Sequence, residues 1–74
     1  MFITITIEVE SKRFDVRIDQ EQKVQEAVQA LQAAGKCRGL GSDFYKSMAN
    51  RKAISAYQTF QEQGIFSGDL LISI

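Results

Sequence analysis

The first nine residues, MFITITIEV, carry an apolar side chain at every odd position, and this spacing constrains the fold more than any other feature. Successive side chains of a β-strand point to opposite faces, so the pattern predicts a strand with one buried face. The β-branched residues in the segment favour the same structure. The rest of the chain must therefore supply sheet neighbours for this strand and a cover for its apolar face.

A second strand is predicted directly after the first. Phe14, Val16 and Ile18 alternate with charged residues, and only the polar segment 10–12 separates them from the first strand. A connection this short predicts an antiparallel hairpin.

The hydrophobic period then changes to that of a helix. Asp19 is the expected N-cap, with Gln22 in the capping-box position, and Gly35 is the expected C-cap. A further helical or 3₁₀ turn is predicted over 55–63, where two aromatic residues stand three positions apart. The predicted buried face of the main helix comprises Val24, Ala27, Val28 and Leu31.

Two short strands, 44–48 and 53–54, and a final strand, 70–74, are predicted in the second half. The first hairpin and the last strand are the most apolar segments, so the last strand is expected beside the first, in the middle of the sheet. The fold class is therefore α+β, with a mixed sheet of four to five strands and one helix packed across one face.

Length and charge limit the kind of protein this is. The 74 residues suffice for one small domain, residues 1–74, with little left over for a deep substrate pocket. Nine basic residues balance nine acidic ones, so neither nucleic acid nor an anionic membrane is an expected partner. No apolar run reaches the length of a membrane span, and no signal peptide is recognisable, so we expect a cytoplasmic protein without membrane insertion.

The composition also argues against catalysis. The chain has no histidine and one cysteine, Cys37, which removes Ser-His-Asp and Cys-His chemistry and a structural zinc site. Cys37 lies beside basic residues but has no base partner in the sequence. The segment Gly39-Leu40-Gly41 lacks the Lys-Ser/Thr of a P-loop, and we interpret it as a plain loop. We expect no enzyme activity, no cofactor and no metal.

The order of these elements resembles the β-grasp fold of ubiquitin. The ending GIFSGDLLISI, residues 64–74, is similar to the Gly-Ile-x-x-Gly-Asp-x-Leu ending of the YukD/EsaB group, with Leu71 at the place of the final Leu. These are ubiquitin-like accessory proteins of bacterial type VII secretion systems. The resemblance implies a non-catalytic protein-interaction module whose partner is a secretion-machinery component.

Two other functions stay open. Ubiquitin-type modifiers and sulfur carriers react through a flexible Gly-Gly tail, whereas this sequence stops at Ile74, so conjugation is not expected. A carrier or modifier with a lost tail is the first alternative. A small subunit of an oxidoreductase complex is the second.

Two rules disagree about the last strand, and the disagreement determines the candidate binding site. Simple alternation buries Leu70, Ile72 and Ile74, whereas the family spacing turns Leu71 inward. In the second register, Leu70 and Ile72 join Phe2 in an apolar patch on the outer sheet face. Such patches mark interfaces, here with a partner or with a second copy in a homodimer.

Two polar features are further candidates. The segment 36–52 is rich in cations, including Lys46, Arg51 and Lys52, and could dock an acidic protein surface, or simply be solvated. The expected helix also carries a second, uncharged stripe, formed by Gln22, Gln25, Gln29 and Gln32. We interpret this stripe as solvated surface, with contact to a partner as the alternative.

Overall fold

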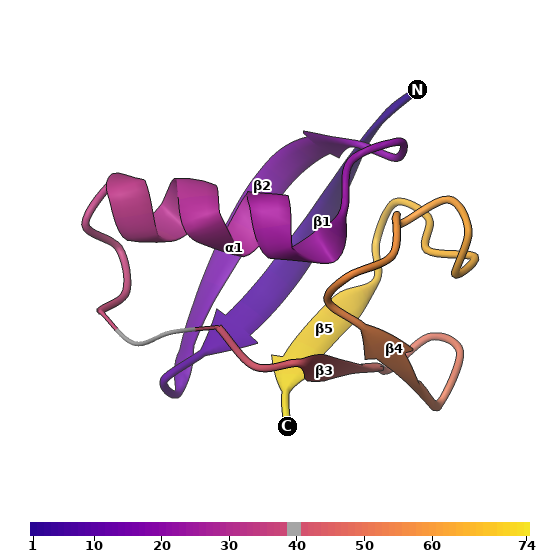
Figure 1. The fold of residues 1–74 in the computed structure, drawn as a ribbon. Coiled ribbons are helices and arrows are strands. Elements are labelled where there is room, and N and C mark those ends of the chain that lie inside the picture. Colours follow the sequence, from indigo (N-terminus) through magenta and orange to yellow (C-terminus); the bar gives the residue numbers. More distant parts are fainter. Residues whose placement is uncertain (39–40) are drawn as a thin grey trace.

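One helix crosses one face of a five-stranded mixed sheet in the computed structural model, which describes residues 1–38 and 41–74 (Figure 1). Gly39 and Leu40, which belong to the segment interpreted above as a plain loop, lie outside the described residues. The strand order in the sheet is β2-β1-β5-β3-β4, which confirms the predicted α+β class and the central place of the last strand. The strands are β1 (Phe2–Val9), β2 (Lys12–Asp19), β3 (Phe44–Ser47), β4 (Lys52–Ser55) and β5 (Leu70–Ser73).

The predicted hairpin of β1 and β2 is confirmed. The two strands pair antiparallel along their whole length, and Val9 pairs with Lys12 at the turn. Glu10 and Ser11 between them both have positive φ angles, 54° and 64°. Positive φ at both central residues is the requirement of a two-residue turn whose twist matches that of the strands. The hairpin register therefore places the odd residues of β1 on one face, where they are buried.

The helix α1 (Val24–Ala33) covers this apolar face, as predicted. Gly35 has a φ of 74°, and the amide of Lys36 donates to the carbonyl of Leu31 at 2.9 Å, so the predicted glycine ends the helix. The helix packs through Val24, Ala27, Val28 and Leu31, all buried. At this length α1 cannot span a membrane, and among the described residues no helix is long and apolar enough to do so.

The predicted start of the helix was wrong. The predicted bond of the capping box forms, because the Gln22 side chain accepts from the Asp19 amide at 3.0 Å, and Asp19 accepts from the amide two residues later at 3.0 Å. These bonds close a separate turn, however, and α1 begins after Lys23. The first helix amides bind backbone carbonyls of a distant segment instead of a side chain. Val24 donates to Gln58 at 3.1 Å and the next amide donates to Ala56 at 2.9 Å. The segment 56–58 thus replaces the side-chain cap and fixes the helix beside β4.

No regular helix forms over 55–63 in the described chain; the segment is a series of turns. One of them is closed by a bond of the 3₁₀ type, from the amide of Gln63 to the carbonyl of Phe60 at 3.3 Å. The two aromatic residues do not share a face, because Phe60 is fully buried whereas Tyr57 is 56% exposed. Gln63 holds the segment against the end of β4. Its side chain accepts from the amide of Ser55 at 2.6 Å and donates to the carbonyl of the same residue at 2.8 Å.

The carboxylate of Asp69 binds the end of the neighbouring strand β3. Asp69 is buried and accepts hydrogen bonds from the Ser47 hydroxyl at 2.5 Å and the Ala49 amide at 3.0 Å. It also accepts from the amide of Leu70 at 2.8 Å. These bonds tie the start of β5 to the end of β3 and so help to fix the register of the central strand.

Candidate interaction surface on the outer sheet face

Leu71 points into the core, and this settles the conflict over the last strand. Its exposure is 0%, whereas Leu70 and Ile72 are only half-buried. Leu71 pairs with Ile7 of β1, which is equally buried. The register implied by the family resemblance is therefore correct, and simple alternation was wrong. Leu70 and Ile72 consequently lie on the face of the sheet opposite α1.

Neighbouring strands continue this apolar surface. Ile72 pairs with Lys46 of β3, and the amide of Met48 donates to the carbonyl of Leu70 at 3.0 Å. At the other end of β3, the carbonyl of Phe44 accepts from the amide of Ile74 at 3.3 Å. The side chains of Phe44, Met48 and Ile74 are all exposed. We call this surface the β5 strip; it comprises Phe44, Met48, Leu70, Ile72 and Ile74.

Phe2, which the sequence argument grouped with Leu70 and Ile72, lies apart from the β5 strip. Leu70 is opposite Thr6 of β1, so Phe2 is four residues away along the strand, about 13 Å at the usual strand rise. The Phe2 ring is 61% exposed and lies under the guanidinium of Arg17, 5.2 Å from its centroid. A cation over an aromatic face is itself stabilising. Phe2 is therefore a separate feature of the outer face.

The charged groups on the two sides of the strip differ. On the β1 side, Arg13 donates to Glu8 at 2.9 Å, and Asp15 accepts from the Thr6 hydroxyl at 2.6 Å. On the β3 side, Lys46 belongs to neither of the ion pairs found in the described residues. The strip therefore presents apolar side chains around one cation that is available for a partner.

The other predicted basic residues do not join Lys46 in one patch. Lys52 pairs with Ser47, and paired residues of neighbouring strands lie on the same face of the sheet. The Cβ of Lys52 therefore lies on the face that α1 covers, whereas Lys46 lies on the outer face. Arg51 occupies the turn between β3 and β4, with a φ of 53°. The amide of Arg38 lies 3.5 Å from a carboxylate oxygen of Glu10, near the β1–β2 turn. The cations of segment 36–52 are thus distributed over several surfaces.

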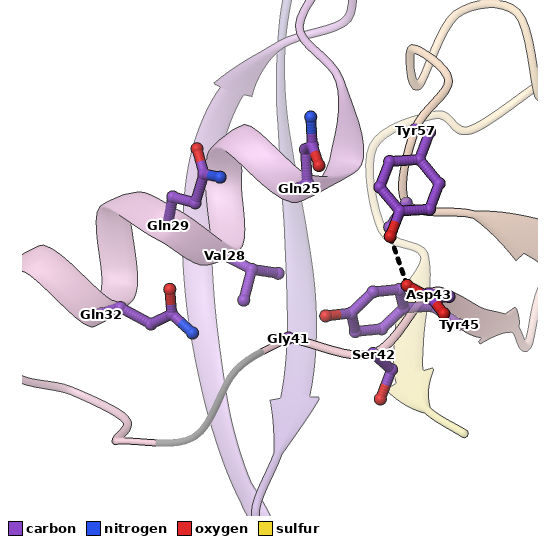
Figure 2. A pocket seen from close by; sticks show the side chains of 10 residues that line it. Gln25, Val28, Gln29, Gln32, Gly41, Ser42, Asp43, Tyr45 and Tyr57 are labelled. Carbon is purple, nitrogen blue, oxygen red and sulfur yellow. Dashed lines mark hydrogen bonds between the residues drawn. The ribbon is translucent and has the colours of Figure 1, made fainter.

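A pocket of about 280 Å³ on the other side of the molecule was not predicted. Figure 2 shows the glutamine amides of α1 on one side of it and Asp43 and Tyr57 on the other. The glutamine stripe was the sequence signal for this place, but the sequence did not show what it would face. The lining residues are Gln25, Val28, Gln29, Gln32, Gly41, Ser42, Asp43, Tyr45, Ala56 and Tyr57.

Two tyrosines give the pocket its polarity. Tyr57 donates a short hydrogen bond to the carboxylate of Asp43, and this bond, together with the carboxylate charge, raises the pKa of the Tyr57 phenol. Tyr45 is fully buried, and its burial raises its pKa against an opposing effect of the Ser42 backbone. Its hydroxyl has no hydrogen bond of ordinary geometry within the described part of the chain.

Comparison with solved structures identifies the architecture. The chain superimposes on the solution structure of a ubiquitin-like domain of an Arabidopsis thaliana protein with a TM-score of 0.74 and 16% identity. The match covers 99% of this chain and 76% of the other. The fold is the ubiquitin-like β-grasp. No family model matches the sequence, and no curated protein matches it.

Proposed function

We propose that this ubiquitin-like chain is a non-catalytic protein-interaction module that docks a partner on the β5 strip. The observation that carries the proposal is the inward position of Leu71, which leaves Leu70 and Ile72 on the outer face. Half-buried aliphatic side chains such as these gain only part of the ~1.5–3 kcal/mol that full burial of each can supply. A partner that covers the strip would supply the remaining burial, and Lys46 would orient an acidic group of that partner.

The absence of catalysis is part of this proposal. The sequence has no histidine, and the described pocket has Asp43 as its one carboxylate. Asp43 is already engaged by the Tyr57 hydroxyl. The other titratable groups of the described lining are the phenols of Tyr45 and Tyr57, whose pKa values are raised above 10.0 and so lie far from the neutral range in which general acid–base catalysis is most effective.

For the cellular role, we propose an accessory or regulatory component of a type VII secretion system. The support is the similarity of residues 64–71 to the ending of the YukD/EsaB group, together with the ubiquitin-like fold. Leu70 of the β5 strip lies within this ending. The partner would then be a component of the secretion machine.

The test combines gene neighbourhood with a binding measurement. If the gene lies beside a membrane ATPase and small helical secreted proteins, the purified chain should bind the cytoplasmic part of that ATPase in a calorimetric titration. Ile72→Ser should weaken this binding, and Arg17→Ser, on the same face but outside the strip, should not. A neighbouring adenylating enzyme that binds the chain, with no binding to a secretion component, would favour the carrier alternative instead.

A further inference from the structure

The pocket beside α1 has features that a merely solvated groove does not need. Gly41 has an ordinary backbone, but a Cβ there would stand 3.0 Å from the Tyr45 hydroxyl and 3.1 Å from a Val28 methyl. The backbone of Gly41 therefore packs closely against the floor of the pocket, and a larger residue would have to displace Tyr45 or Val28. The three glycines with positive φ angles differ, because an added Cβ at any of them meets nothing within 4 Å. Gly41 is thus required for the close approach of its loop to Tyr45 and Val28, and not for an unusual backbone angle.

A buried polar group without a partner lies at this floor. The Tyr45 side chain is 0% exposed, and its hydroxyl finds no hydrogen bond among the described residues. Figure 2 shows this hydroxyl directed toward Val28 and Gly41. A buried polar atom left unpaired is costly, so a hydrogen-bond donor that reached this oxygen after a small shift of the floor would stabilise the site.

The negative charge of the pocket favours a positively charged ligand group. Asp43 is the one charged residue in the described lining and takes part in neither ion pair of the described chain. No lysine or arginine of the described chain lines the pocket, although several occur in the surrounding segment. The ring of Tyr57 is held at the rim by its bond to Asp43 and offers a face on which a cation can lie.

The hydrogen-bond acceptors of the pocket favour a guanidinium over an ammonium group. The phenol oxygen of Tyr45, the carboxylate of Asp43 and the amide oxygen of Gln25 can all accept hydrogen bonds. A planar guanidinium offers several N–H donors in a fixed fork, carries no acceptor and stacks on aromatic rings, whereas an ammonium is a compact and strongly hydrated charge. From this geometry we propose that the pocket takes the guanidinium group of an arginine side chain presented by a partner protein.

This inference goes beyond the proposed function, because the pocket lies between α1 and segments 41–43 and 56–57, whereas the β5 strip lies on the opposite face of the sheet. A partner could use one surface without the other. Binding of an arginine side chain should therefore survive Ile72→Ser, and docking on the strip should survive a change of Asp43.

The experiment is a titration of the full chain with N-acetyl-arginine-N-methylamide, followed through backbone amide signals by NMR. We expect saturable shifts at Gln25, Gln29 and Gly41–Asp43, with a dissociation constant on the order of 1 mM for so small a probe. The citrulline analogue has the same shape without the charge and should bind at least tenfold more weakly. Equal binding of both probes, or shifts confined to other surfaces, would overturn the proposal.

Variants separate the charge of the site from general effects. Asp43→Asn should weaken arginine binding at least tenfold, whereas Glu26→Gln, the same change of charge at an α1 residue outside the pocket, should leave it unchanged. Gly41→Ala should reduce binding by pushing Tyr45 or Val28 out of place at the floor, with the helical circular dichroism retained. Unchanged binding in Asp43→Asn would refute the proposed role of charge. Tighter binding of free arginine than of the blocked probe would refute a protein source.

Discussion

Leu71 of β5 lies opposite Ile7 of β1, and both side chains have an exposure of 0%. This parallel pair fixes which face of the central strand enters the core. It also fixes the reverse face, because side chains alternate along a strand. The half-buried positions of Leu70 and Ile72 are therefore a consequence of core packing, and the candidate interaction surface follows from the same contact.

The Asp69 carboxylate should be a major contributor to stability. Asp69→Ala would leave the Ser47 hydroxyl and the Ala49 amide without their acceptor in a buried place. We expect the free energy of unfolding, measured in urea, to fall by about 3 kcal/mol or more. The matched control is Asp15→Ala, which removes an exposed acceptor from the Thr6 hydroxyl and should cost less than about 1 kcal/mol. Equal effects of the two changes would contradict the role assigned to Asp69.

Removal of the unpaired Tyr45 hydroxyl should not harm the fold. Tyr45→Phe keeps the buried ring and deletes the polar atom that has no partner in the described chain. We expect the free energy of unfolding to rise by about 1 kcal/mol, while arginine binding weakens. A fall of more than 1 kcal/mol in the same urea titration would mean that the hydroxyl is satisfied in solution.

Alkaline pH should destabilise the protein through its tyrosines. The pKa values of Tyr45 and Tyr57 are both raised above 10.0, Tyr45 by burial and Tyr57 by its bond to Asp43. The folded chain then holds the phenol protons more tightly than the unfolded chain. The resulting stability is complete below pH 10 and is lost as the pH rises through the folded pKa values.

Ultraviolet titration of the phenols checks this account. Both tyrosines should ionise above their ordinary range, and in Asp43→Asn the pKa of Tyr57 should fall back toward 10.0, because the carboxylate charge is gone. Unfolding measured at several pH values should show stability decreasing above pH 10. Ordinary titration of both residues in the unchanged chain would contradict the Tyr57–Asp43 interaction.

Much of the fold was predictable because local patterns and tertiary packing agree. The odd residues of β1, the α1 face around Val28 and the helix end at Gly35 all follow from spacing and backbone preference. The start of α1 could not be predicted, because carbonyls of segment 56–58, distant in sequence, satisfy its first amides. The failure at Tyr57 has a similar cause, since hydrogen bonds from Gln63 hold the segment in turns.

The candidate sites were less predictable than the fold. Periodicity alone favoured burial of Leu70 and Ile72, and only the spacing of a resembling family gave the observed register. The position of Phe2 relative to the β5 strip depends on the pairing of β1 with β5, which a single sequence does not specify. The pocket depends on the approach of α1 to Gly41–Asp43, a contact between elements that no local pattern encodes.

The most direct measurement compares Ile72→Ser with Leu71→Ser in urea unfolding and in binding to the proposed secretion partner. Leu71→Ser should unfold the domain, because a core truncation that also buries a hydroxyl costs several kcal/mol. Ile72→Ser should lower the free energy of unfolding by only about 1 kcal/mol, yet weaken partner binding at least tenfold. If Ile72→Ser unfolds the chain while Leu71→Ser is tolerated, or if Ile72→Ser binds the partner as the unchanged chain does, the β5 strip is not the interaction surface.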